Sequence, residues 1–91
     1  MNLEGKYILL KRENIRETIN FLYREGYHFM DSEKSEMIEK LYSMNNDLYL
    51  ILLSEFIAYG FYESIKNSNM KYIIHDIKNY IRKAKLENIL K

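Results

Sequence analysis

The longest apolar stretch of the chain limits what it can fold into. This stretch runs from Leu48 to Tyr62, and Ser54 and Glu55 interrupt it. A helix that crosses a bilayer needs roughly 20 apolar residues, so the stretch is too short to span a membrane. The N-terminal residues also lack the basic segment and following apolar run of a signal peptide. We therefore expect a soluble, cytoplasmic protein that buries this stretch in its core.

Two kinds of structure fit the stretch, because periodicity does not distinguish strands from a helix in a nearly continuous apolar run. One is a β-hairpin with strands at about 48–52 and 57–61. The other is a buried helix over about 48–66. The density of Ile, Tyr and Phe favours the hairpin, as does Gly60, since glycine costs about 1 kcal/mol inside a helix. No Asn-Gly or Asp-Gly turn signal separates the two halves, so the helix remains the alternative.

The first half of the chain alternates short apolar runs with helical patterns. Ile15, Ile19 and Leu22 recur at spacings of four and three, which defines one face of a helix. Gly26 follows at a position where helices commonly end. By the same reasoning, the sequence predicts strands at about 7–11 and 27–30 and helices at about 13–25 and 32–44.

The last third of the chain has the strongest helical periodicity. It predicts a helix from about residue 70 to 85 or beyond, with one apolar sector. The residues of that sector are Met70, Ile73, Ile74, Ile77, Tyr80, Ile81 and Ala84. After Lys85 the apolar residues fall at other angles, so the tail is expected to bend, fray or pack elsewhere.

These elements predict a fold class. With 91 residues and no internal repeat or linker, the chain is expected to form a single domain over residues 1–91. The order strand, helix, strand, helix, hairpin, helix indicates a small α+β domain with helices on one face of a sheet. If residues 48–66 are helical instead, the alternative is an all-α bundle.

The near-neutral charge hides an asymmetry along the chain. The formal net charge is +1, but residues 1–65 carry 7 basic and 11 acidic side chains, whereas residues 66–91 carry 7 basic and 2 acidic. Basic residues of the predicted last helix recur at spacings of four, three, four and three, with one aromatic residue expected to be exposed nearby. These candidate binding residues are Lys71, His75, Lys78, Arg82 and Lys85, with Tyr72 as the aromatic.

Three roles are open for this basic stripe. It can be the solvated side of a helix, with cations near the C-terminus complementing the helix dipole. It can contact the phosphates of a nucleic acid, because neutralising them releases counterions. It can also meet an acidic surface of a partner protein.

The sequence offers no recognisable catalytic or metal-binding arrangement. There is no Cys, the three Gly residues are isolated, and no Ser lies in a G-x-S-x-G context. His28 and His75 are the two histidines, and neither belongs to a set of three or four ligands at zinc-site spacing. We expect a protein that is not an enzyme and that needs no cofactor or metal.

A binding protein is therefore the leading functional hypothesis. The chain is compact and rich in Tyr, a residue enriched at interfaces. Its abundant Ile, Lys, Asn and Tyr and its lack of Val and Pro are typical of an AT-rich genome, such as a low-GC bacterium or its phage. We expect a small non-enzymatic protein, encoded by a phage or mobile element, that binds and inhibits or regulates a larger protein. The alternatives are a nucleic-acid-binding module and a self-associating structural subunit.

Overall fold

The computed structural model describes residues 3–65, 67 and 73–90. The described elements, in chain order, are β1 (Tyr7–Leu10), η1 (Arg12–Asn14), α1 (Ile15–Arg24), α2 (Lys34–Ser43), β2 (Leu48–Leu53), β3 (Phe56–Phe61), η2 (Tyr62–Ser64), β4 (Ile73–Ile74) and α3 (Lys78–Leu90), where η denotes a short 3-10 helix. The predicted α+β class is confirmed. The all-α alternative is wrong, because the long apolar stretch forms two strands.

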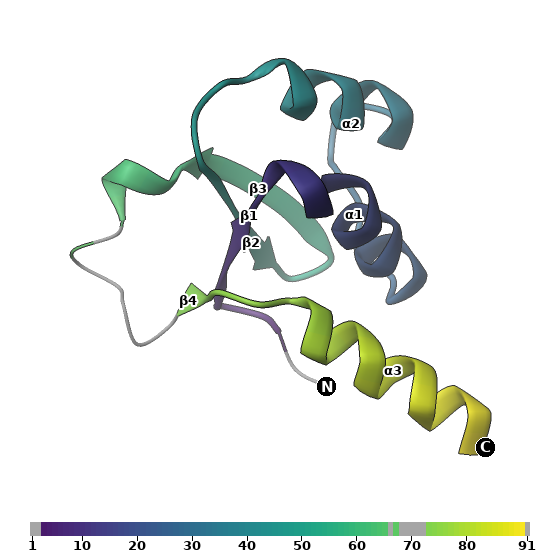
Figure 1. Cartoon of the computed structure of the whole chain (residues 1–91). Helices are drawn as coiled ribbons and strands as arrows, with labels where there is room; N and C mark the ends of the chain where they lie inside the picture. The colour runs from purple at the N-terminus through teal and green to yellow at the C-terminus, as the bar shows by residue number, and fades with distance from the viewer. Residues whose placement is uncertain (1–2, 66, 68–72, 91) are drawn as a thin grey trace.

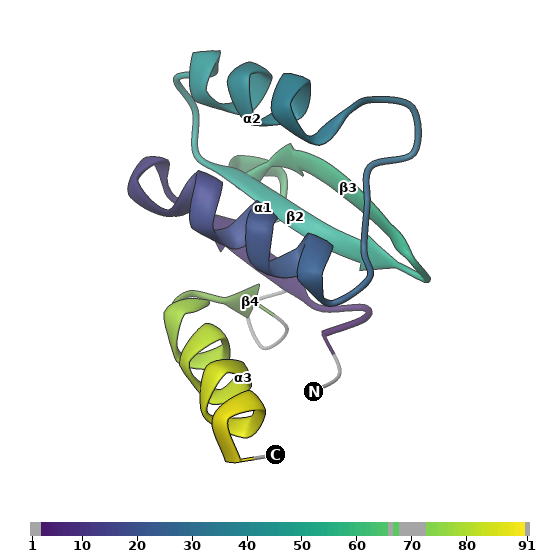
Figure 2. The same ribbon diagram turned by 90° about the vertical axis from the view of Figure 1, so that its right-hand side faces the viewer.

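The strands form one sheet with helices on one side. Their order is β3-β2-β1-β4; β2 pairs antiparallel with β1 and β3, and β4 pairs parallel with β1. Figures 1 and 2 show α1, α2 and α3 on the same side of this sheet, with α2 toward β3, α1 over the middle and α3 toward β4. The opposite side carries no α-helix of the described residues, only the short η2 near the end of β3; we call it the helix-free face. In the described part of the chain, no helix is both long and apolar enough to cross a membrane.

The predicted hairpin is confirmed, with a tighter turn than expected. Leu53 pairs with Phe56, so the loop consists of Ser54 and Glu55 alone. Ser54 has a φ of 60°, the positive angle that a type II′ turn requires at its first loop residue. Glycine usually occupies that position, which explains why the sequence carries no obvious turn signal.

The predicted strand at 27–30 is wrong, because only His28 forms backbone hydrogen bonds with the sheet. Its N–H donates to the Glu55 carbonyl at 3.0 Å, and its carbonyl accepts the Ile57 N–H at 2.9 Å, which makes an isolated parallel bridge. The Phe29 N–H, which points away from β3, donates to the Tyr23 hydroxyl of α1 at 3.0 Å. Phe29 is buried in the core at 6% exposure, so its side chain and its N–H both lead the chain away from the sheet edge.

The predicted start of the last helix is also wrong. Ile73 and Ile74 form β4, and α3 begins at Lys78 and continues to Leu90. Residues 70–72 lie outside the described residues. The Asp76 carboxylate accepts the Lys78 N–H at 3.0 Å and so satisfies one of the free donors at the start of α3. The isoleucines before it fit a strand because they are apolar, β-branched and adjacent to β1.

The core lies between the sheet and the three helices. Alternate strand residues face the helices and are almost fully buried, including Ile8, Leu50 and Leu52 at 0% exposure. α1 contributes Ile15, Ile19, Phe21 and Leu22; α2 contributes Met37, Ile38 and Leu41; and α3 contributes Ile81 and Ala84, with Ile77 just before it. The helical faces predicted for α1 and α2 therefore belong to this core. Of the sector predicted for the last helix, Ile74, Ile77, Ile81 and Ala84 belong to it, whereas Ile73 does not.

On the helix-free face, the Tyr49 ring lies over Gly60. Tyr49 and Gly60 are cross-strand partners, and the Tyr7 and Tyr49 rings meet edge to face with centroids 5.2 Å apart. A Cβ added at Gly60 would approach the Tyr49 ring to 2.6–2.8 Å. Glycine in β3 thus leaves room for a tyrosine pair that covers part of this face.

Gly60→Ala should therefore destabilise the protein, by about 1–2 kcal/mol, because the Tyr49 ring must move. In a Tyr49→Ala background the same change should be neutral or slightly stabilising, since Ala is favoured over Gly in a strand by roughly 0.5–1 kcal/mol. Urea unfolding of the four proteins in this double-mutant cycle measures both effects. Equal costs in the two backgrounds would contradict the proposed contact.

Candidate interaction surface

The structure keeps part of the predicted basic stripe together. Lys78, Arg82 and Lys85 are exposed on α3 at spacings of four and three, so they share one side of the helix. His75 is exposed in the connection before α3, so the prediction that it belongs to the same helix is wrong. Lys71 and Tyr72 lie outside the described residues, and their predicted role remains a prediction.

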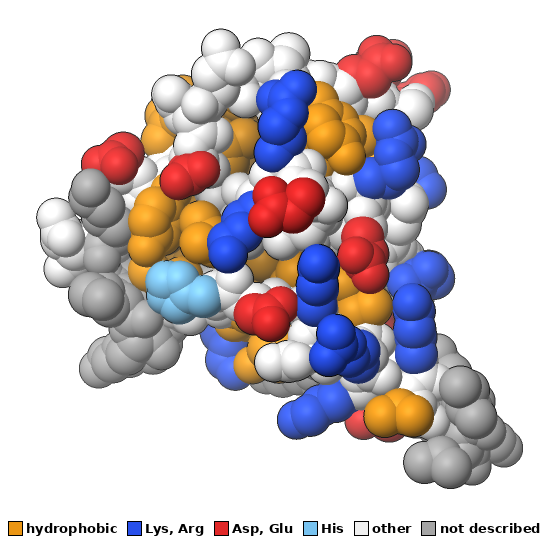
Figure 3. Space-filling view, viewed as in Figure 1, with side chains coloured by type: hydrophobic (Ala, Val, Ile, Leu, Met, Phe, Trp, Pro, Cys, Tyr) orange, Lys and Arg blue, Asp and Glu red, His pale blue; other side chains and the backbone are white. Residues whose placement is uncertain are grey.

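Around this stripe, positive and negative side chains alternate. Lys85 lines an open groove of about 480 Å³ with Arg16 and Arg24 of α1, but Glu13 and Glu17 line the same groove. Figure 3 shows Lys and Arg side chains over α1 and α3 with Asp and Glu among them. The surface is positive in places but is not an uninterrupted basic track.

Two of the basic residues near α1 contact the C-terminal end of α2. Arg12 donates from Nη1 to the Tyr42 carbonyl at 2.9 Å, and its guanidinium lies 5.8 Å from the centre of the Tyr42 ring. Arg16 lies 5.9 Å from the same ring. A cation that binds a carbonyl at a helix C-terminus stabilises that end, so Arg12 has a structural role at the junction of α1 and α2.

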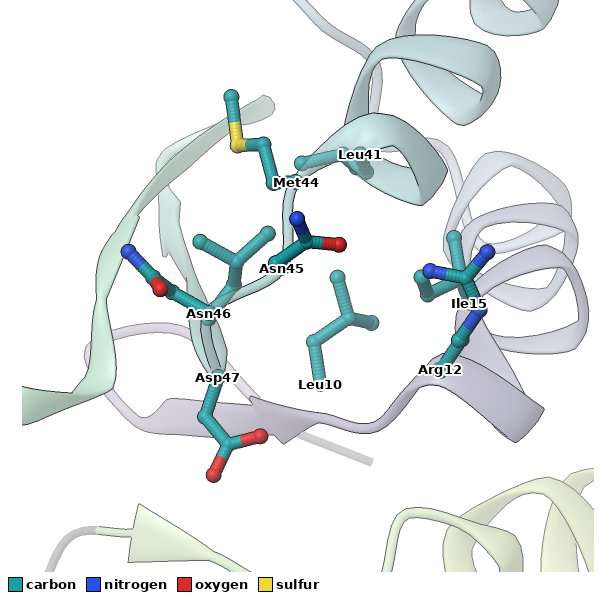
Figure 4. Close-up of a pocket in the computed structure, with 9 residues that line it drawn as sticks. Leu10, Arg12, Ile15, Leu41, Met44, Asn45, Asn46 and Asp47 are labelled. Atoms are coloured by element: carbon teal, nitrogen blue, oxygen red, sulfur yellow. The ribbon is translucent and has the colours of Figure 1, made fainter.

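The crevice beside Arg12 is small. Figure 4 shows it between the start of α1 and the end of α2, with Arg12 on one side and residues 45–47 on the other. Leu10 and Leu41 contribute apolar walls. Its volume is about 230 Å³, below the roughly 300–1,000 Å³ of typical ligand pockets. In the described part of the chain, no three His, Asp or Glu side chains gather as they would to bind a metal ion.

The hairpin exposes apolar side chains on the helix-free face. By register, Ile51, Leu53, Phe56 and Ala58 share this face; Leu53 is 53% exposed, and the other three are partly exposed. We call these four residues the hairpin surface. The His28 ring lies edge to face with Phe56, with centroids 4.9 Å apart, and extends the surface beyond β3.

Other exposed apolar residues lie close to the same strand. Phe61 ends β3 and is 51% exposed, and Met30, which is 64% exposed, lines a groove with Ile57 and Tyr59. Together with Leu53, they account for three of the four large hydrophobic side chains found exposed in the described residues; the fourth is Leu86 of α3. These side chains do not form one patch, because Phe61 pairs with buried Leu48 and shares the helix-covered face, and the Met30 groove lies on the α2 side. The four residues of the hairpin surface do lie together on one face, and such clustering distinguishes an interaction site from singly exposed apolar residues.

The helix-free face is more buried toward β4. Ile73, which pairs with Tyr7, is 9% exposed and lies outside the main core. Ile65, just after η2, is also buried outside that core. The accessible part of this face is therefore its hairpin end.

The sequence of β2 contains a signal for this surface, separate from the basic stripe. In β2, the run Leu48–Leu53 is apolar at every position, whereas a strand with one solvated face normally alternates apolar and polar residues. When helices cover only one side of the sheet, a strand like β2 keeps apolar side chains exposed on the other side.

No protein-family model matches the chain, and neither the curated proteins nor the solved structures include a match.

The exposure of Leu53 can be tested against its buried neighbour. Leu53→Lys should change the free energy of unfolding by less than about 1 kcal/mol, because the side chain is already in water. Leu52→Ala should cost about 2–5 kcal/mol, because Leu52 is fully buried. Urea unfolding measures both; a large loss of stability in Leu53→Lys would mean that the hairpin surface is part of the core.

Proposed function

We propose that this chain is a small non-enzymatic protein that binds a larger protein and inhibits or regulates it, and that a phage or another mobile element encodes it. The observation that carries the proposal is the hairpin surface, four apolar side chains that share the helix-free face at its accessible end. A helix-free sheet face with clustered apolar side chains suits burial against another protein. The edge-to-face tyrosines beside it supply the aromatic area that interfaces favour.

Binding to a partner tests this proposal. The chain, immobilised, should capture a stoichiometric protein from the lysate of a low-GC bacterial host at physiological salt. Leu53→Lys should abolish capture, because burying an unpaired charge in an interface is costly. Leu86→Lys is a matched control, since Leu86 is a comparably exposed leucine, at 58%, on α3.

The outcomes separate the hypotheses. Capture that survives Leu53→Lys would contradict the hairpin surface as the binding site. Recovery of the chain's own second copy, with no other protein, would favour the self-associating alternative. Failure to capture any stoichiometric protein would count against the proposal as a whole.

Nucleic-acid binding is the second candidate, and the arrangement of α1 and α3 favours it. Lys78, Arg82 and Lys85 share one side of α3, and Lys85 meets Arg16 and Arg24 across a groove. These five cations could contact phosphates along a short path. Glu13 and Glu17 in the same groove weaken this candidate.

A salt series checks this second candidate. If these residues bind phosphates, affinity for duplex DNA or RNA should fall steeply as salt rises, with a slope set by the number of contacts. Arg82→Gln and Lys85→Gln together should reduce that slope by about 2, because each contact contributes nearly one unit. Absence of binding at low salt would rule the candidate out.

A further inference from the structure

The outer edge of β3 has backbone groups that no strand satisfies. Alternate residues of an antiparallel strand direct their N–H and C=O groups away from the paired neighbour. The bond from the Ile57 N–H to the His28 carbonyl, at 2.9 Å, identifies Ile57 as one of the outward-facing residues, so Tyr59 and Phe61 are the next two. An edge with unpaired backbone groups is a template for a further strand.

Four of these groups have no hydrogen-bond partner in the described part of the chain. They are the Ile57 carbonyl, the N–H and the carbonyl of Tyr59, and the Phe61 N–H. The Phe61 carbonyl differs, since it accepts the Ser64 hydroxyl at 2.7 Å. No charged residue or proline blocks this edge within β3, although natural edges are commonly protected in that way.

The chain itself begins a strand on this edge and then leaves it. His28 forms a parallel bridge with β3. In a continuing parallel strand, Met30 would bond to the Ile57 carbonyl and to the Tyr59 N–H. Neither bond is present, because the chain turns into the core at Phe29. The edge beyond His28 is therefore shaped for a parallel strand and lacks one.

We propose that this edge binds an extended three-residue segment of the partner protein, running parallel to β3. The first residue of the segment bonds to the Ile57 carbonyl and the Tyr59 N–H. The third bonds to the Tyr59 carbonyl and the Phe61 N–H, so all four groups are satisfied. This inference rests on the proposed function and specifies how the partner is recognised.

An antiparallel segment fits this edge less well. If it is centred on Tyr59, it must place a residue beside Ile57, where His28 already lies. If the antiparallel segment is centred on Gly60, one of its N–H groups must donate to the Phe61 carbonyl, which already accepts a hydrogen bond from Ser64. The Ile57 carbonyl then stays unpaired. Two copies related by a two-fold axis would pair their β3 edges in this antiparallel way. The geometry therefore favours a different chain over a second copy.

The side chains of the segment alternate between the two faces of the sheet. Residues bridged in parallel strands share a face, as the edge-to-face rings of His28 and Phe56 show. The first and third residues would thus lie beside Ala58 and Gly60 on the helix-free face. Ala58 is small and leaves room beside it for a bulky apolar first side chain, whereas the third would lie against the Tyr49 ring that covers Gly60. Both would be continuous with the hairpin surface.

The middle side chain would point toward α2. A groove of about 310 Å³ lies on that side, between β3 and the chain around Met30, and Lys40 and Asp31 are its charged residues. Lys40 is the one beside Tyr59, with Nζ 5.7 Å from the centre of the ring. An acidic middle residue would pair with Lys40, so the expected motif is apolar, acidic, apolar.

A pair of variants at Phe61 tests the role of the backbone. Phe61→Pro removes the outward N–H. Proline fits the backbone at this position, because φ is −82° and the Phe61 N–H does not bond to β2. Phe61→Ala removes the same ring but keeps the N–H. A displayed library of random heptapeptides is selected on the wild-type chain, and the dissociation constants of the recovered peptides are measured for all three proteins.

Recovered peptides should share the apolar, acidic, apolar pattern. Phe61→Pro should weaken them about fivefold or more relative to Phe61→Ala, the loss of one hydrogen bond, while both variants unfold at similar urea concentrations. Equal affinities for the two variants, or no recovered peptide, would overturn the inference. A wild-type dimer would also overturn the inference if Phe61→Pro weakens it more than Phe61→Ala does, because the edge would then bind a second copy of the chain. If the lysate partner is captured equally by both variants, the proposed function stands and strand addition does not.

Discussion

The structure depends on one constraint: three short helices cover only one face of a four-stranded sheet. Ile8, Leu50 and Leu52 are fully buried under these helices. The opposite faces of the same strands are also apolar, because β1 and β2 have no charged residue at any position. Burial of apolar area contributes about 25 cal/mol per Å². A partner that buries the uncovered face would therefore gain binding free energy. Tyr7 and Tyr49 cover part of this face with rings that also tolerate water at their hydroxyl ends.

A second, local interaction leaves the edge of β3 open beside the hairpin surface. The hydrogen bond from the Phe29 N–H to the Tyr23 hydroxyl, with the burial of the Phe29 ring, takes the chain away from β3 after a single bridge. Had residues 29–30 continued along the edge, β3 would be an interior strand. Instead the edge and the hairpin surface adjoin each other, so backbone and side-chain recognition can act on the same partner.

Much of the fold could be predicted from the sequence. The helical faces of α1 and α2 and the hairpin followed from local spacing and residue type, which act over a few neighbours. The errors lie where tertiary contacts override local pattern. Residues 27–30 have strand-like composition, but only His28 bonds to β3, and the Phe29 N–H is held by the hydroxyl of Tyr23 in α1. Ile73 and Ile74 fit the helical period of α3 equally well, and pairing with β1 makes them a strand.

The candidate site was harder to predict than the fold. The basic stripe depended on a continuous helix from residue 70, but Ile73 and Ile74 form β4 and His75 lies in the connection before α3. The hairpin surface depends on which face of the sheet the helices leave open, and that choice is not encoded in any single segment. The apolar run Leu48–Leu53 indicated an extra apolar face, but its position beside an unpaired edge follows only from the strand order.

Amide hydrogen exchange of the free chain tests the open edge most directly. Protection should alternate along β3: the Ala58 and Gly60 amides, which bond to β2, should exchange slowly, whereas the Tyr59 and Phe61 amides should exchange fast. Equal protection of all four amides in the dilute, monomeric protein would mean that another segment already occupies the edge. The account of how this chain recognises a partner would then be wrong.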